Sequence, residues 1–244
     1  GGGGGGGGFA ELLRNRRLLL VGGALMTFQS LTGINSVIFY STTIFRLAGV
    51  RQDILGTMAV GVANVGMTVV SSRLVDTRGR KVLLLAGTWT MAAALAGLSG
   101  TLLLLGSWGA AQGVLAVGFV LLFVGGFAVG LGAVAWIVLS EITPTALRST
   151  AFSVFVSCNW LCSLAISLST LTAIRVLGGG DDKTGVARLY LVFCGLCLLC
   201  LAFLYKYLPE TKGGAGLGKD GGGVEFRPVP TREDDDVGME EGGL

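Results

Sequence analysis

A long stretch without charged side chains constrains this 244-residue chain more than any other feature. No Asp, Glu, Lys or Arg occurs between Val82 and Ser140. As one helix, this stretch would be about 88 Å long, nearly three times the thickness of a bilayer's hydrocarbon core. It must therefore turn, and the glycine-rich segment 106–113 is the only break in it. The chain is thus expected to contain membrane-spanning helices.

The composition also favours a membrane protein. Apolar residues make up 52% of the chain and charged residues only 14%, whereas soluble domains carry about 25% charged residues. The chain has no histidine, which excludes histidine-based acid–base chemistry and most zinc sites. We expect a protein that is not an enzyme, with no metal, no other cofactor and no nucleic-acid partner.

Charged residues mark the ends of six expected spans, which predict an all-α membrane protein with a six-helix bundle over residues 16–212. The spans are 18–45, 54–72, 82–105, 114–140, 151–174 and 189–205. Residues 1–15 begin with eight glycines and are expected to form a flexible linker, so the chain is expected to start inside a longer protein. Residues 213–244 are rich in Gly, Asp and Glu and are expected to form a disordered acidic tail.

The distribution of basic residues predicts the orientation of the bundle. The flanks on the side of both termini carry Arg14, Arg16, Arg17, Arg73, Arg78, Arg80, Lys81, Arg148, Lys206 and Lys212. The opposite loops carry Arg46, Arg51, Arg175, Lys183 and Arg188. Because basic loops stay in the cytoplasm, both ends of this segment are expected to be cytoplasmic. The sequence does not indicate which membrane holds the protein.

The first span is rich in polar residues for a membrane helix. Gln29, Gly33, Ser36 and Tyr40 are spaced by four, three and four, so they share one helix face. The span 18–45 exceeds the roughly 20 residues that one crossing needs, and Gly33 lies near its centre. These features favour a break in the helix, and broken helices that line a midplane cavity are typical of transporters.

Other expected spans carry amide and indole groups at bilayer depth, namely Asn64, Trp136, Asn159 and Trp160. Amides donate and accept hydrogen bonds, and indoles add a flat apolar face, which suits a neutral polyhydroxylated solute. Hydrogen bonding between helices is the alternative interpretation of each polar residue alone. No Asp or Glu lies in the middle of any expected span, so a proton-coupling carboxylate is absent or lies outside this chain.

Charged clusters occupy two short loops at the expected cytoplasmic side, at residues 76–81 and 141–148. Opposite charges in neighbouring loops can pair across helix ends, and such pairs could hold that side shut in one conformational state. The alternative interpretation is that these charges only set the orientation of the chain, because exposed ion pairs are individually weak.

Several ordered motifs resemble the sugar porter family of the major facilitator superfamily, and specifically the six helices of its carboxyl-terminal half. In chain order, they are QSLTGIN (29–35) with FYS (39–41), DTRGRK (76–81), EITPTALR (141–148), NW (159–160) and PETKG (209–213). The family implies transport of a monosaccharide by alternating access, with or without protons. It also implies that an amino-terminal six-helix half completes the carrier, since the cavity lies between two halves.

The resemblance implies three groups of functional residues. Those expected to bind the sugar are Gln29, Asn35, Asn64, Trp136 and Asn159. Those expected at the outer gate and beside the cavity are Tyr40 and Trp160, respectively. Those expected to form a cytoplasmic charge network are Asp76, Arg80, Lys81, Glu141 and Arg148.

The sequence departs from the family pattern at several positions. Ser30 replaces a second glutamine, and Ala128 stands where many members have an acid that contacts the sugar. Residues 133–135 replace the usual proline-rich stretch before Trp136. Whether this span is kinked as in the family therefore does not follow from its sequence. A polyol or inositol transporter is therefore one alternative. The other two alternatives are a membrane sugar sensor that does not transport and an incomplete fragment without function.

Overall fold

The computed structural model describes residues 5–47, 53–104 and 110–208. Every regular element within these ranges is helical, as predicted for an all-α fold. The elements are α1 (Gly5–Arg14), α2 (Arg16–Leu31), α3 (Ile34–Leu47), α4 (Asp53–Arg78), α5 (Arg80–Leu104), α6 (Ala110–Phe127), the π-helix η1 (Ala128–Gly132), α7 (Val134–Ile142), the 3₁₀-helix η2 (Thr145–Leu147), α8 (Arg148–Gly178) and α9 (Asp182–Tyr207).

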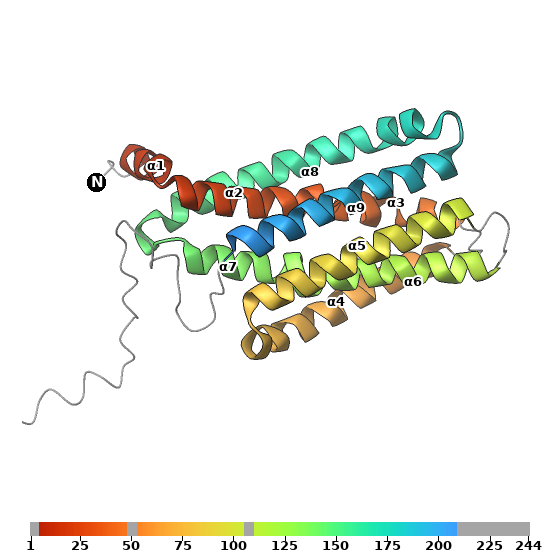
Figure 1. Ribbon diagram of the computed structural model, residues 1–244, viewed down its shortest axis with the longest axis horizontal. Coiled ribbons are helices and arrows are strands. Elements are labelled where there is room, and N and C mark those ends of the chain that lie inside the picture. Colours follow the sequence, from red (N-terminus) through yellow and green to blue (C-terminus); the bar gives the residue numbers. More distant parts are fainter. Residues whose placement is uncertain (1–4, 48–52, 105–109, 209–244) are drawn as a thin grey trace, which may run out of the picture.

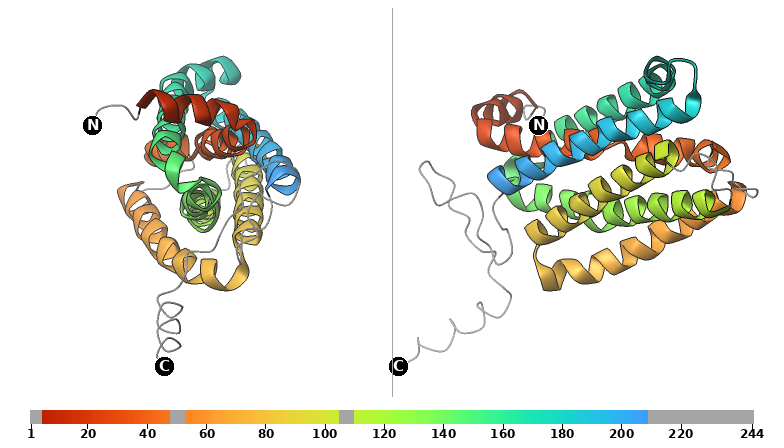
Figure 2. Two further views of the ribbon diagram at one scale, coloured as in Figure 1. Left: turned by 90° about the vertical axis from the view of Figure 1, so that its left-hand side faces the viewer. Right: turned by 45° about the vertical axis from the view of Figure 1, so that its right-hand side comes forward.

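The long helices lie side by side along the long axis of the molecule (Figure 1), and the view along that axis shows them as a bundle (Figure 2). Helix α5 packs against both α6 and α9, while α8 packs against α2 and α9. The start of α2 and the carboxyl end of α9 lie at the same end of the bundle (Figure 1). The described chain therefore runs along the bundle an even number of times.

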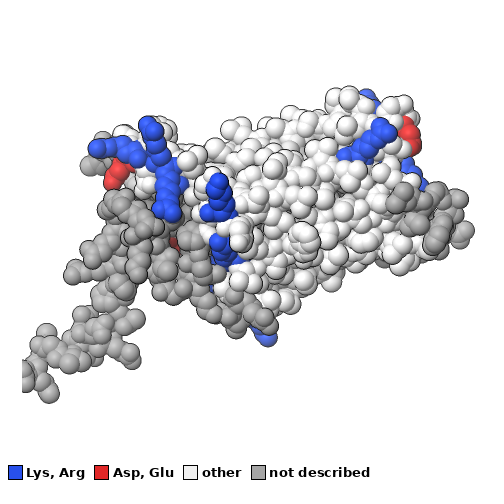
Figure 3. Space-filling model, in the orientation of Figure 1, with Lys and Arg blue, Asp and Glu red and all other residues white. Residues whose placement is uncertain are grey.

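Charged side chains lie at the two ends of the bundle on the face shown in Figure 3, and the middle is free of them. Large apolar side chains are exposed between these ends, such as Trp89, Leu168 and Leu199. Within the described ranges, five stretches are long and apolar enough to cross a membrane: Arg16–Thr42, Arg80–Leu103, Ala111–Ile142, Thr145–Gly178 and Asp182–Tyr207. The expected span 54–72 falls in α4, where several side chains lie outside the described part.

The first crossing is broken, which confirms the break predicted near Gly33. Helix α2 ends at Leu31 and α3 begins at Ile34. Gly33 between them has a φ of +84°, a conformation that side chains with a Cβ rarely adopt. A Cβ at this position would also lie 2.5 Å from Cδ2 of Phe193 on α9. Backbone conformation and space therefore both require glycine here.

The fourth crossing is interrupted in a different way, by the π-helix η1 between α6 and α7. The interrupted segment contains alanine, valine, leucine and glycine but no proline. A π-helix replaces the usual i→i+4 hydrogen bonds by i→i+5 bonds and is a recognised cause of helix kinks. This crossing is therefore irregular even though it lacks the prolines of the family pattern.

Three glycines bring α5 into backbone contact with the fourth crossing. A Cβ added at Gly87 would lie 2.6 Å from the carbonyl oxygen of Gly126 and 2.7 Å from Cα of Gly130. A Cβ at Gly130 would in turn lie 3.0 Å from Cα of Gly87. Small residues let membrane helices approach this closely, so η1 is packed directly against α5.

The amino-terminal segment differs from the flexible linker expected over residues 1–15. The structure has a helix, α1, over Gly5–Arg14, and Leu12 within it is fully buried. This helix packs against α8 and η2 at the end of the bundle. The linker was predicted from the run of glycines, but the apolar residues that follow the glycines are part of α1. The acidic tail expected over 213–244 lies outside the described residues.

The glycine contact predicts a difference between two substitutions in the same helix. Gly87→Ala should destabilise the protein by about 1–3 kcal/mol, because the added Cβ meets backbone atoms that cannot move aside. Gly100→Ala is the matched control, since nothing lies within 4 Å of a Cβ there. Thermal unfolding in detergent measures both variants, and equal stabilities would contradict this packing.

Candidate functional site

Gln29 links three elements through its side-chain amide. It lies near the end of α2, just before the break, and is 6% exposed. Its Nε2 donates to the carbonyl oxygen of Leu131 in η1 at 2.7 Å. Its Oε1 accepts a hydrogen bond from Nδ2 of Asn159 on α8 at 2.9 Å. The amide therefore joins the first crossing to the π-helix and to α8.

Asn159 adds further bonds between α8 and α2. Its Nδ2 also donates to the carbonyl oxygen of Met26 at 2.9 Å. The hydroxyl of Ser30 donates to the backbone carbonyl of Asn159 at 3.0 Å and lies 2.9 Å from the hydroxyl of Ser163. Ser30, which replaces a family glutamine, thus bonds to α8 within this cluster.

Two other predicted sugar-binding residues have side-chain amides without partners among the described residues. Asn35 lies in the first turn of α3, directly after the break, and Asn64 lies in the middle of α4. Both are partly exposed. Trp136 is partly buried on α7 and packs against the apolar core. The structure therefore joins Gln29 and Asn159 and leaves the two other amides available for hydrogen bonding.

The two residues expected at the gate and beside the cavity lie on α3 and α8. Tyr40 is partly exposed on α3, beyond the break in the first crossing. Trp160 follows Asn159 directly on α8 and is 69% exposed. The Trp160 side chain is therefore largely accessible on α8.

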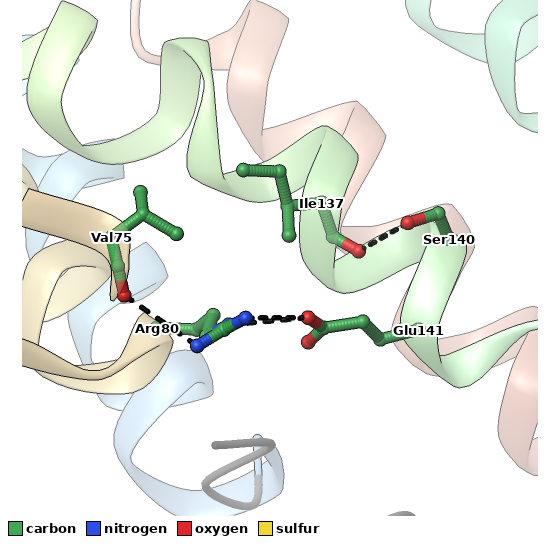
Figure 4. A network of polar contacts seen from close by, with 5 residues as sticks. All are labelled: Val75, Arg80, Ile137, Ser140 and Glu141. Carbon is green, nitrogen blue, oxygen red and sulfur yellow. Dashed lines mark hydrogen bonds and ion pairs between the residues drawn. The ribbon is translucent and has the colours of Figure 1, made fainter. Parts of the chain in front are cut away.

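An ion pair joins α5 and α7 at the end of the bundle that holds the start of α2. The Nε and Nη2 atoms of Arg80 each lie 3.1 Å from Oε1 of Glu141, and Arg80 Nη1 donates to the carbonyl oxygen of Val75 at 3.5 Å (Figure 4). The side chains of Arg80 and Glu141 are 20% and 29% exposed. Oε2 of Glu141 is buried and has no hydrogen-bond partner among the described residues.

Two other members of the expected charge network, Lys81 and Arg148, bond to backbone carbonyls. Lys81 Nζ donates to the carbonyl oxygen of Tyr205 on α9 at 3.1 Å and lies 5.7 Å from the centre of the Tyr205 ring. Arg148 Nη2 donates to the carbonyl oxygen of Ser140 at 3.4 Å. The side chain of Asp76 lies outside the described residues. Among the four of these side chains that the structure describes, Arg80 and Glu141 form an ion pair.

The sequence analysis did not predict the hydrogen bonds between side chains and the backbone carbonyls of η1. The carbonyl of Leu131 and the hydroxyl of Ser71, which donates to the carbonyl of Val129 at 3.2 Å, were not expected in the site. The one available signal was the replacement of the family's prolines, which left the bend of this crossing unexplained. Among the described residues, no three side chains of His, Cys, Asp or Glu lie close enough to hold a metal ion.

Comparison with known proteins gives the family and the fold. Residues 7–215 match the model of the family described as "Sugar (and other) transporter". The chain is 35% identical over 205 residues to "Plastidic glucose transporter 4" of Arabidopsis thaliana, covering 79% of this chain and 34% of that protein. It is 33% identical over 192 residues to "Facilitated trehalose transporter Tret1" of Bombyx mori, covering 78% of this chain and 37% of that protein.

A solved structure is similar as well. The crystal structure of a D-xylose-proton symporter superimposes with a TM-score of 0.73 at 30% sequence identity, covering 84% of this chain and 46% of that one. The fold therefore defines an integral, multi-pass membrane protein with a helical bundle like that of the major facilitator superfamily. Within that class, the chain belongs to the sugar (and other) transporter family. It spans less than half the length of these relatives.

The ion pair at the end of the bundle predicts a specific energetic coupling. In a double-mutant cycle, Arg80→Gln and Glu141→Gln should show a coupling of up to about 1 kcal/mol, because the pair is only partly exposed. Lys81→Gln with Glu141→Gln is the control cycle, and its effects should add to within about 0.5 kcal/mol. Unfolding in detergent measures both cycles. A larger coupling for Lys81 than for Arg80 would contradict the observed pairing.

Proposed function

We propose that this chain is the carboxyl-terminal six-helix half of a twelve-helix carrier that moves a neutral monosaccharide across a membrane by alternating access. The observation that carries this proposal is the cluster of Gln29 and Asn159 beside the break in the first crossing. The order of the sequence motifs along residues 29–213 supports placing the chain in the carboxyl-terminal half. The partner would then be an amino-terminal six-helix half with its own face toward the cavity.

The chemistry of these groups suits a sugar better than an ion. Each sugar hydroxyl both donates and accepts a hydrogen bond, and each side-chain amide offers both kinds of group. Asn35 and Asn64 have such groups unpartnered among the described residues, while Trp136 and Trp160 supply flat apolar faces for the C–H groups of a sugar ring. Relatives named for glucose, trehalose and xylose support this substrate class.

The proposed cavity would open alternately to the two sides of the membrane. Arg80 and Glu141 join the ends of α5 and α7 in this structure, and we propose that their ion pair forms in one state and separates in the other. Arg148, Lys81 and Asp76 would contribute to the same charged end. No carboxylate lies in the middle of an expected span, so proton coupling would depend on a carboxylate in the other half.

Substitution of the amides should reduce transport by the complete carrier. Gln29→Ala and Asn35→Ala should each lower the uptake of labelled D-glucose or D-xylose on the order of tenfold, since each removes hydrogen bonds to the substrate. Gln112→Ala is a matched amide control, because Gln112 Nε2 donates to the carbonyl of Thr101 away from the cluster. Uptake is normalised to the amount of folded carrier in the membrane.

The same assay with myo-inositol distinguishes the polyol alternative. Saturable uptake of the two sugars, with little uptake of inositol, would support a monosaccharide carrier. Undiminished uptake in both amide variants would remove these residues from the binding site.

The basic flanks generate a second prediction, that both ends of this segment face the cytoplasm. In intact cells, a cysteine at position 183, in the first turn of α9, should react with an impermeant thiol reagent. Cysteines at positions 17 and 206 should react only after the membrane is opened, because they flank the opposite end of the bundle. These experiments use a carrier in which the five cysteines of this chain, and any in the other half, are replaced by serine. Labelling of positions 17 and 206 in intact cells would contradict the proposed orientation.

A further inference from the structure

The π-helix η1 receives side-chain hydrogen bonds from two different helices. Gln29 of α2 donates to the carbonyl oxygen of Leu131 at 2.7 Å, and its Nε2 also lies 3.5 Å from the carbonyl oxygen of Gly132. Ser71 of α4 donates to the carbonyl oxygen of Val129 at 3.2 Å. Both donors are buried, with exposed fractions of 6% for Gln29 and 0% for Ser71.

These two bonds have a physical reason at this position. The irregular turn of η1 does not supply the regular α-helical hydrogen bonds to every carbonyl around it. Ala128, Gly130 and Leu131 of η1 are buried, and an unsatisfied carbonyl in a buried position is unfavourable. Donors from α2 and α4 therefore stabilise the irregular form of this crossing, whose sequence contains no proline to impose it.

The packing around η1 adds a third contact. Gly87 of α5 brings its backbone against Gly126 and Gly130, so this side of the fourth crossing has no room for movement toward α5. The bond from Ser71 links η1 to α4, and the bond from Gln29 links it to α2. Of these three contacts, only that with Gln29 involves a residue of the proposed sugar site.

Both ends of the Gln29 amide are engaged in this structure. Its Nε2 donates to η1, while its Oε1 accepts from Asn159. A sugar hydroxyl that accepts a hydrogen bond from Nε2 would compete with the carbonyl oxygen of Leu131, whereas a hydroxyl that donates to Oε1 would share that oxygen with Asn159. An exchange at Nε2 would remove the bond between α2 and the carbonyl of Leu131.

We propose that Gln29 and Ser71 are positioning residues that hold η1 in its π-helical form, and that Gln29 releases the Leu131 carbonyl when sugar binds. The release step rests on the function proposed above, whereas the holding of η1 does not. Sugar occupancy would thereby loosen the fourth crossing on its α2 side, while Ser71 and Gly87 keep it attached to α4 and α5. This links binding at the amide cluster to α7, whose last turn carries Glu141.

Hydrogen–deuterium exchange of the complete carrier in detergent tests the first step without sugar. In peptides that cover residues 128–137, Gln29→Met and Ser71→Ala should each speed exchange about fivefold, the factor that corresponds to losing one hydrogen bond. Ser30→Ala is the matched control, since Ser30 bonds to α8 and not to η1. Its exchange over 128–137 should equal that of the unsubstituted carrier. Exchange in α9 peptides, which contain neither residue, reports whether each variant is folded.

Addition of D-glucose or D-xylose tests the second step. When binding is detected by calorimetry, exchange over 128–137 should rise in the unsubstituted carrier and stay unchanged in Gln29→Met if that variant still binds. Unchanged exchange in sugar-free Gln29→Met would overturn the positioning role. Sugar binding that leaves or lowers exchange over 128–137 would overturn the release. Absence of binding by any sugar would overturn the proposed function and the release with it, while the sugar-free comparison would still decide the positioning role.

Discussion

The structure depends on one constraint, that a chain inside a bilayer must satisfy its own backbone hydrogen bonds. Continuous helices meet this constraint alone, but the first and fourth crossings are interrupted at Gly33 and at η1. At the first interruption, the hydroxyl of Thr32 donates to the carbonyl oxygen of Gln29 at 3.0 Å. At the second, Gln29 and Ser71 supply the donors. Side chains thus replace the bonds that the irregular backbone lacks.

The two interruptions are linked by a single residue. Gln29 belongs to the last turn of α2 and bonds to η1, so the break in one crossing lies next to the bend in another. Asn159 connects the same amide to α8. A solute bound here would contact α8 and also the two irregular points, the end of α2 and η1. This arrangement explains how a small neutral molecule could influence the packing of long helices, since it competes for hydrogen bonds that join them.

The sequence predicted the helical class and the break at Gly33, because charge-free length and a central glycine have direct physical consequences. It predicted the family from the order of its motifs. It did not predict η1, because alanine, valine and glycine occur in α-helices as well, so these residue types do not distinguish a π-helix from an α-helix. It also missed α1, where Leu12 is buried although glycines precede it. The family resemblance implied one network of five charged residues, but Lys81 bonds to the end of α9 because the position of a helix end decides which carbonyl is within reach.

Protection of Asn35 and Asn64 by sugar is the most direct test of the central claim that these amide-bearing helices line an aqueous cavity. Cysteines at positions 35 and 64 of the complete carrier, with its native cysteines replaced, are labelled with a water-soluble thiol reagent. Position 183, in the first turn of α9, serves as the control. The account predicts that both positions react and that D-glucose or D-xylose slows their labelling, while position 183 is unaffected. Labelling of positions 35 and 64 that bound sugar leaves unchanged would contradict it.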